Sequence, residues 1–257
     1  MDLLHGSSAF ASAFAAGAIN SVAGGGTLVT FPTLIWLGLD SVSANATSTV
    51  AIWPGSLGGM WGFQKELRTA DPRMLALTLP SLVGGISGAL LLRFTPPSIF
   101  DALVPFLILF ATVLFMVQET VQRIFKTGEA RHESARWLTG AILFQFFVSL
   151  YGGYFGAGIG ILMLAALSIL GLTDIHQMNG LKNFFALLIN GVAAIYFMVA
   201  HMLQWPYVLI MAAGAIAGGY GGAGIARKIG RTAVRRVVIG IGFAMAAALF
   251  AKWVSRS

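Results

Sequence analysis

The 257-residue chain contains no cysteine, which excludes a disulfide framework, a thiol nucleophile and a thiolate metal site. Its four histidines are scattered and form no metal-binding spacing with carboxylates. No Walker-type phosphate loop is present, and the glycine-rich runs do not follow a strand as a dinucleotide fingerprint requires. We therefore expect neither an enzyme nor an ATPase, and we expect no cofactor or metal.

Charged residues are scarce, at 10% of the chain, whereas soluble domains carry about 25%. Asp40 is the only charged side chain between residues 3 and 64, and Asp174 and Lys182 are the only ones between 137 and 226. Apolar runs of about 20 residues recur, and each is long enough to cross a bilayer as a helix. The sequence predicts an all-α, multi-pass membrane protein.

The net charge of +7 is concentrated in three short loops between apolar runs, at 64–73, 122–136 and 226–236. Loops 94–98 and 200–206 and the N-terminus contain almost no basic residues. This distribution is typical of the positive-inside rule, so we expect the three basic loops to be cytoplasmic. We expect a lipid bilayer rather than a nucleic acid as the partner.

Eight apolar units are separated by these loops and by shorter turns. Two units are interrupted by glycine, the first by Gly24, Gly25 and Gly26, and the fifth by glycines between 152 and 158. The units cover about 7–37, 42–63, 74–93, 99–122, 137–170, 178–201, 206–226 and 233–253.

The chain resembles itself at an offset of 133 residues, because glycines that interrupt apolar runs coincide. The matched pairs are Gly25 with Gly158, Gly38 with Gly171, Gly58 with Gly191, Gly85 with Gly218, and Gly88 with Gly221. Internal duplication with broken helices is typical of secondary transporters. We expect two four-segment repeats, 1–127 and 128–257, within one integral membrane domain.

The loop charges predict that the repeats are inverted. The loop after unit two is basic, whereas its counterpart after unit six carries no Lys or Arg. Inversion requires an odd number of crossings in each half, and units two to four already supply three. Units one and five should therefore be broken hairpins that return to the side they entered. Both termini would then lie outside the cytoplasm.

Broken helices within a membrane present free N–H groups and the positive end of a helix dipole, and both favour a bound anion. Polar side chains cluster near both interruptions. The candidate binding residues are Asn20, Ser21, Gly24, Gly25, Asn45, Thr47 and Ser48 in the first half, and Tyr151, Gly156, Gly158, Asn179, Lys182 and Asn183 in the second.

Each candidate also has a structural interpretation. Small residues permit close helix crossings, hydroxyls bond to their own helix, and asparagines bond to neighbouring helices. Tyr151 can act as an interfacial anchor, and Asp40 and Asp174 are placed to cap helices. Lys182 either extends to the membrane interface or acts within the membrane, where it would neutralise an anion or carry a proton.

Two motifs resemble those of the TauE/SafE sulfite exporter family, also grouped as toluene-sulfonate-uptake-type permeases. The first covers 16–32 (AGAINSVAGGGTLVTFP) and continues at 44–48 (ANATS); the second covers 151–160 (YGGYFGAGIG) and 179–183 (NGLKN). The resemblance extends over essentially the whole chain. It implies a bacterial inner-membrane carrier with seven to nine segments, usually eight. It also implies a substrate such as sulfite, a sulfonate or sulfoacetate.

These observations predict a secondary transporter that works by alternating access around an anion site at the membrane midplane. Protons or the membrane potential would drive it. A passive anion channel and a non-transporting membrane partner protein are the alternatives. The sequence pattern is neutral on the exact anion, the direction of transport and the oligomeric state.

Overall fold

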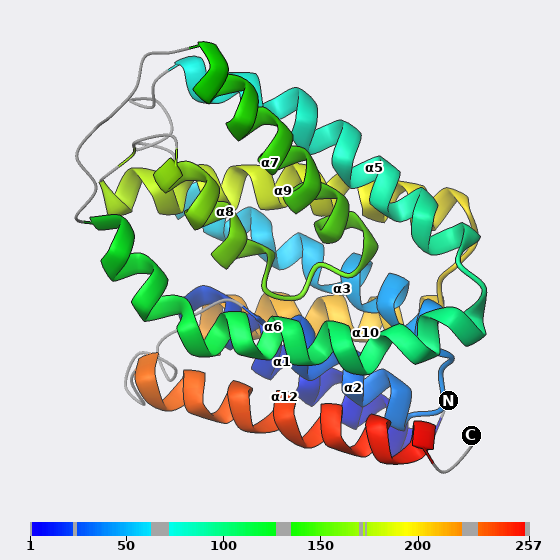
Figure 1. Ribbon diagram of the computed structural model, residues 1–257. Coiled ribbons are helices and arrows are strands. Elements are labelled where there is room, and N and C mark those ends of the chain that lie inside the picture. Colours follow the sequence, from blue (N-terminus) through cyan, green and yellow to red (C-terminus); the bar gives the residue numbers. More distant parts are fainter. Residues whose placement is uncertain are drawn as a thin grey trace.

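The computed structural model describes residues 2–22, 25–62, 72–126, 135–169, 172, 174–222 and 231–254. Within these ranges every regular element is a helix, and the helices form one bundle (Figure 1). The expected all-α class is confirmed.

The described helices are divided between the two halves of the chain. The first half contains α1 (Leu3–Val22), α2 (Thr27–Trp36), α3 (Ser41–Gly62), the 3-10 helix η1 (Pro72–Leu77), α5 (Thr78–Phe94) and α6 (Pro97–Lys126). The second contains α7 (Ala135–Tyr154), α8 (Ile159–Ile169), α9 (Ile175–Val199), α10 (Trp205–Ala217), the π-helix η2 (Gly218–Gly222) and α12 (Arg231–Val254).

Four described segments are long and apolar enough to cross a membrane: Met74–Phe94, Pro97–Val117, Gln177–Val199 and Ala233–Ala251. By contrast, α2 has 10 residues and α8 has 11. At 1.5 Å per residue each covers about 15 Å, half the thickness of the hydrocarbon core. These two half-length helices follow the two glycine interruptions, so the predicted breaks are present in the fold.

The bundle has two distinct ends (Figure 1). The start of α1 and the end of α12 lie at one end, together with the α5–α6 and α9–α10 junctions. The described helix ends that flank the three basic loops lie at the other end: the last turns of α3 and α6 and the first turns of α7 and α12. Helix α2 runs back alongside α1, and α8 runs back alongside α7, so each pair is arranged as a hairpin.

Helices α5 and α7 run parallel and touch through glycine. A Cβ atom placed on Gly84 would lie 2.6 Å from the carbonyl oxygen of Phe146. One turn further on, a Cβ on Gly88 would overlap the carbonyl of Leu150. Only glycine permits this approach of two backbones, which replaces side-chain interdigitation with direct backbone contact.

Helices α1 and α10 make the same kind of parallel contact. A Cβ on Gly214 would lie 2.6 Å from the carbonyl oxygen of Phe10, and a Cβ on Gly218 would overlap the carbonyl of Phe14. Each half of the chain therefore packs one of its helices closely against the other half.

Two further crossings, α6 with α12 and α3 with α9, are antiparallel. Phe106 of α6 meets Phe250 of α12 edge to face, with ring centroids 4.9 Å apart, and Arg235 donates to the Met116 carbonyl at 3.1 Å. Between α3 and α9, the Trp53 indole N–H donates to the Leu187 carbonyl at 3.1 Å.

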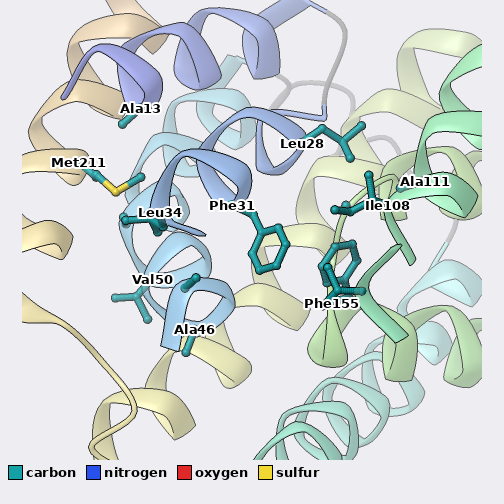
Figure 2. Packing of buried hydrophobic residues seen from close by; sticks show 14 of the residues in the cluster. Ala13, Leu28, Phe31, Leu34, Ala46, Val50, Ile108, Ala111, Phe155 and Met211 are labelled. Atoms are coloured by element: carbon teal, nitrogen blue, oxygen red, sulfur yellow. The ribbon is translucent and has the colours of Figure 1, made fainter. Parts of the chain in front are cut away.

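The largest apolar cluster joins α2, α6 and the connection between α7 and α8. Phe31 of α2 faces Phe155 of that connection, with ring centroids 5.4 Å apart at nearly right angles (Figure 2). Leu28, Ile108 and Ala111 belong to the same buried cluster (Figure 2). This part of the core thus lies where the break of the second half meets the short helix of the first.

Candidate functional site

The first break lies between α1 and α2. Gly25 adopts a positive φ of 86°, a conformation that favours glycine because it has no Cβ. The side-chain oxygen of Asn20 accepts the N–H of Gly26 at 2.8 Å, so one of the free donors at the start of α2 is satisfied. Ser21 is in the last turn of α1, but its side chain and all of Gly24 lie outside the described residues.

The second break lies between α7 and α8. Gly156 and Gly158 both have positive φ, at 79° and 78°. The Tyr151 hydroxyl donates to the Ala157 carbonyl at 2.6 Å and so spans the break from the last turn of α7. The N–H of Phe155 returns to the Tyr151 carbonyl at 2.9 Å. Tyr151 therefore holds the shape of this connection.

Both breaks lie against α6. A Cβ on Gly25 would overlap the ring of Phe115, and a Cβ on Gly158 would lie 3.5 Å from Ala111. Ala111 and Phe115 are one helical turn apart, on the same face of α6. Together with the Phe31–Phe155 contact, this brings the breaks of the two halves into one region of the bundle.

Lys182 of α9 lies beside the first turn of α8. A Cβ on Gly160 would be 3.3 Å from Cδ of Lys182, and the lysine ammonium donates to the Asn179 side-chain oxygen at 3.1 Å. Lys182, Asn179 and the neighbouring Asn183 are all half-buried. A cation beside the positive end of a helix is unfavourable alone, so an anion bound there would be stabilised by both.

Asn190, also on α9, faces the second break. Its side-chain oxygen lies 3.7 Å from where a Cβ on Gly156 would be. The break is therefore flanked on one side by an amide and, at the start of α8, by the lysine. We infer that Asn190 belongs with the candidate residues, although it is not among the thirteen chosen from the sequence.

Asn45 of α3 connects the two halves. It is 1% exposed, and its amide N–H donates at 2.9 Å to the carbonyl of Tyr154, the last residue of α7. The side-chain oxygen of Asn45 is buried and has no donor within the described part of the chain.

The next two candidates on α3 have protein partners. Thr47 accepts the backbone N–H of Gln204 at 3.1 Å, which joins α3 to the α9–α10 turn. The Ser48 hydroxyl lies 2.6 Å from that of Thr30, and both residues are fully buried. These bonds favour the structural interpretation of the two hydroxyls in this conformation.

Sequence reasoning did not include Thr30, Gly160 or a buried amide cluster among the candidates. Gln145 donates to the hydroxyls of Ser81, at 2.9 Å, and Ser149, at 3.4 Å, between α5 and α7. The signal available for this cluster was a Gln and a Ser four residues apart in an apolar run, a spacing that places both on one helix face.

Four described helices that are long and apolar enough to cross a membrane, together with two half-length helices after glycine breaks, define a multi-pass membrane protein. The chain belongs to the TauE/SafE sulfite exporter family, whose family model matches residues 9–249. The resemblance of the two motifs is thereby confirmed.

Several curated relatives match most of the chain. A probable membrane transporter protein of Haemophilus influenzae is 28% identical over 242 residues, which cover 93% of this chain and 91% of the relative. The probable membrane transporter protein YfcA of Escherichia coli is 26% identical, over 93% of this chain and 87% of the relative. No solved structure matches the chain significantly.

Proposed function

We propose that the protein is a secondary transporter of small sulfur-containing anions, such as sulfite or an organosulfonate such as sulfoacetate. Its family and its relatives' names support membrane transport. The family description, sulfite exporter, supports an oxyanion of sulfur as the substrate class.

The observation that carries this proposal is the position of Lys182 beside the first turn of α8. The start of α8 supplies backbone N–H groups and a positive dipole end, and Lys182 adds a full positive charge. Gly156, Gly158 and Gly160 carry no side chain, so an anion can approach the backbone closely. A tetrahedral or pyramidal oxyanion can accept several of these donors together.

We further propose that the two halves are inverted repeats that exchange helices. A Cβ on Gly17 would overlap the carbonyl of Ala215, and a Cβ on Gly153 would overlap the carbonyl of Gly85. Gly17 and Gly153 are 136 residues apart, whereas Gly85 and Ala215 are 130 apart. The same kind of backbone contact thus occurs in both halves. The corresponding residues are 136 and 130 positions apart, on either side of the sequence offset of 133.

Alternating access would follow from such an arrangement. Helix α5 packs on α7 and α9 of the second half, and α10 packs on α1 and α3 of the first. A rocking movement of one half against the other would expose the break region to each end of the bundle in turn. An ion gradient or the membrane potential would supply the driving force, and the end that carries the basic loops would be cytoplasmic.

The proposal is tested by flux into liposomes that contain the purified protein. Labelled sulfite is supplied with and without an imposed proton gradient, and sulfonates and a carboxylate are added as competitors. We expect saturable flux that sulfonates inhibit more strongly than the carboxylate, and that Lys182→Met reduces at least tenfold. Non-saturable flux would indicate a channel, and no flux of any anion from folded protein would contradict transport.

A further inference from the structure

The helices group into two bodies that differ from the two halves of the chain. Helix α5 packs on α7 and α9 of the second half, whereas α10 packs on α1 and α3 of the first. Within each group, glycines place backbone directly against backbone, and such close packing leaves little room for the helices to slide. Each group is therefore expected to move as a unit. We call α1, α2, α3 and α10 the first body, and α5, α7, α8 and α9 the second body.

The two bodies cross where α3 meets α9. The indole N–H of Trp53 donates to the Leu187 carbonyl at 3.1 Å, and a Cβ on Gly191 would lie 3.1 Å from the indole ring. Among the described helices, α3 and α9 are the pair that joins the two bodies over an extended length. A single crossing with a glycine on one helix allows two rigid bodies to rotate about it while they stay in contact.

Two buried contacts join the bodies nearer the end of the bundle where α1 begins. Helix α3 also begins at this end, and Asn45 lies eight residues before Trp53, a separation of about 12 Å along the helix. The Asn45 amide N–H donates to the Tyr154 carbonyl at 2.9 Å. Phe31 meets Phe155 edge to face, with ring centroids 5.4 Å apart (Figure 2). Asn45 and Phe155 are 1% exposed and Phe31 is fully buried, so these contacts exclude water.

On the other side of the crossing, toward the end that carries the basic loops, the side chains are polar and more exposed. Lys182 lies five residues before Leu187 on α9, and Asn179, Lys182 and Asn183 are all half-buried. One side of the crossing is thus sealed by two rings and an amide, whereas the other presents partly accessible polar side chains. This asymmetry is the one expected when the break region is closed toward the end where α1 begins.

We propose that the two buried contacts form a gate and that the α3–α9 crossing is the pivot about which the bodies rock. The gate consists of the bond from Asn45 to Tyr154 and the contact between Phe31 and Phe155. When it opens, the break region would become accessible from the end where α1 begins. This role rests on the proposed alternating access, and it identifies the contacts that must break in each transport cycle.

The chemistry of Asn45 suits a contact that opens and closes. A hydrogen bond between neutral groups holds it to Tyr154, and Asn45 Oδ1 meets no donor in the described part of the chain. A buried acceptor without a donor is costly. Opening would expose this oxygen and the Tyr154 carbonyl to water, which can donate to both. The desolvation cost of the closed gate thus offsets part of the bond that closes it, so the two states can lie close in free energy.

The absence of cysteine allows the gate to be tested with single introduced thiols. Thr49 lies four residues after Asn45 and four before Trp53, on the same face of α3, and is 7% exposed. Full-length Thr49→Cys protein is labelled with a membrane-impermeant maleimide in right-side-out and in inverted vesicles, so each end of the bundle is probed whichever one is cytoplasmic. We expect slow labelling from both sides. Asn45→Leu, which cannot donate to Tyr154, should accelerate it at least fivefold from one side only, and no acceleration would overturn the gate.

A second position tests whether the movement is reciprocal. Asn183→Cys, beside Lys182, should be labelled rapidly from the opposite side in the otherwise unchanged protein. Asn45→Leu should slow this labelling at least twofold, because opening the break region to one side closes it to the other. Faster labelling at both positions would indicate local loosening instead of rocking and would overturn the proposal.

The matched control is Gln145→Leu. Gln145 is also 1% exposed, but its amide donates to Ser81 and so joins α5 to α7 within the second body. We expect this variant to lower the stability of the protein and to leave both labelling rates within twofold of their original values. Equal acceleration by Asn45→Leu and Gln145→Leu would show a general loss of packing and contradict a specific gate.

Phe155→Leu keeps the test decisive where Asn45→Leu does not fold. It removes the ring contact with Phe31 and should change the two labelling rates in the same directions, whereas Phe106→Leu, which breaks a ring pair between α6 and α12, should not. Anion flux is measured separately in liposomes, because sulfite itself adds to maleimide. Reciprocal labelling without flux of any anion would support the gate and contradict the proposed transport. Anion flux with unchanged labelling in both gate variants would do the reverse.

Discussion

The two breaks both contain a glycine with positive φ, but they differ in the side chains around that glycine. Gly25 and Gly158 have nearly the same positive φ, 86° and 78°, and both lie against α6. The first break is closed by Asn20, which accepts the N–H of Gly26. The second is held by Tyr151, and Lys182 lies at the start of the helix that follows.

Because of this difference, the two helix starts differ in their capacity to bind an anion. A helix start whose donor is already satisfied by an amide has less capacity for an anion. A helix start beside a lysine gains capacity, because charge-assisted hydrogen bonds are roughly twice as strong as neutral ones. We infer that the first break mainly shapes the bundle and that the second binds the anion.

The largest expected effect concerns the two positive-φ glycines. Gly25→Ala should lower the free energy of unfolding by about 3 kcal/mol, from left-handed strain plus overlap with the Phe115 ring. Gly158→Ala should cost about 1 to 2 kcal/mol, because its Cβ would meet Ala111 at an ordinary 3.5 Å. Reversible unfolding in mixed micelles measures both.

The control for this pair is Gly240→Ala on α12, where a Cβ would meet nothing within 4 Å. Alanine there should stabilise the helix by up to about 1 kcal/mol. An equal loss for Gly25→Ala and Gly158→Ala would show that contact with α6 does not distinguish the breaks.

The second effect concerns the charge at the second break. Lys182→Met removes the ammonium and keeps an apolar stem against Gly160. We expect the dissociation constant for sulfite to rise about tenfold to a hundredfold, equivalent to about 1.4 to 2.8 kcal/mol. Isothermal titration of the purified protein gives the constant directly.

Arg235→Met is the matched control, since it removes a cation whose described bond is to the Met116 carbonyl, in the second half of α6. We expect its effect on sulfite binding to stay below twofold. If both variants weakened binding equally, the effect of Lys182 would reflect overall charge rather than its place beside α8.

The third effect tests the structural role of the first break. Asn20→Ala removes the acceptor for the Gly26 N–H and should cost about 1 kcal/mol of stability, as the loss of a helix cap does. Asn20→Asp keeps an acceptor for this N–H and should therefore retain most of the stability that Asn20→Ala loses. Anion affinity should be unchanged, and a tenfold loss in Asn20→Ala would move the binding site to the first half.

The hairpins and the broken helices could be predicted from sequence because each depends on a strong local signal. Consecutive glycines interrupt a helix wherever they occur, and basic residues mark the loops between spans. The half-length α2 and α8 follow directly from Gly24–Gly26 and from the glycines between 152 and 158.

The register between the halves could not be predicted with a single offset. At the sequence offset of 133 residues, Gly85 is matched with Gly218. In the bundle, however, Gly218 packs against Phe14 in the way that Gly88 packs against Leu150, so Gly88 rather than Gly85 corresponds to Gly218. The shift is about one helical turn. A one-turn shift leaves the apolar and glycine pattern of a helix nearly unchanged, so the pattern alone does not reveal it.

The partners of individual candidates depend on contacts distant in sequence. Asn45 and Tyr154 are separated by 109 positions, and Thr47 and Gln204 by 157. Nothing local distinguishes an amide that bonds a neighbouring backbone from one that binds an ion. Lys182 was recognised because a lone cation in a long apolar region is costly, although its contact with Gly160 was not foreseen.

The smallest expected effect tests that contact. In Gly160→Ala the new Cβ would lie 3.3 Å from Cδ of Lys182, so the lysine must move by a few tenths of an ångström. We expect sulfite affinity to fall about two- to threefold, or about 0.5 kcal/mol, while α8 becomes slightly more stable because alanine favours helix. Gly140→Ala on α7, where a Cβ would meet nothing within 4 Å, should leave affinity unchanged. Unaltered affinity in Gly160→Ala, measured by the same titration, would mean that the ammonium position does not depend on packing against the start of α8.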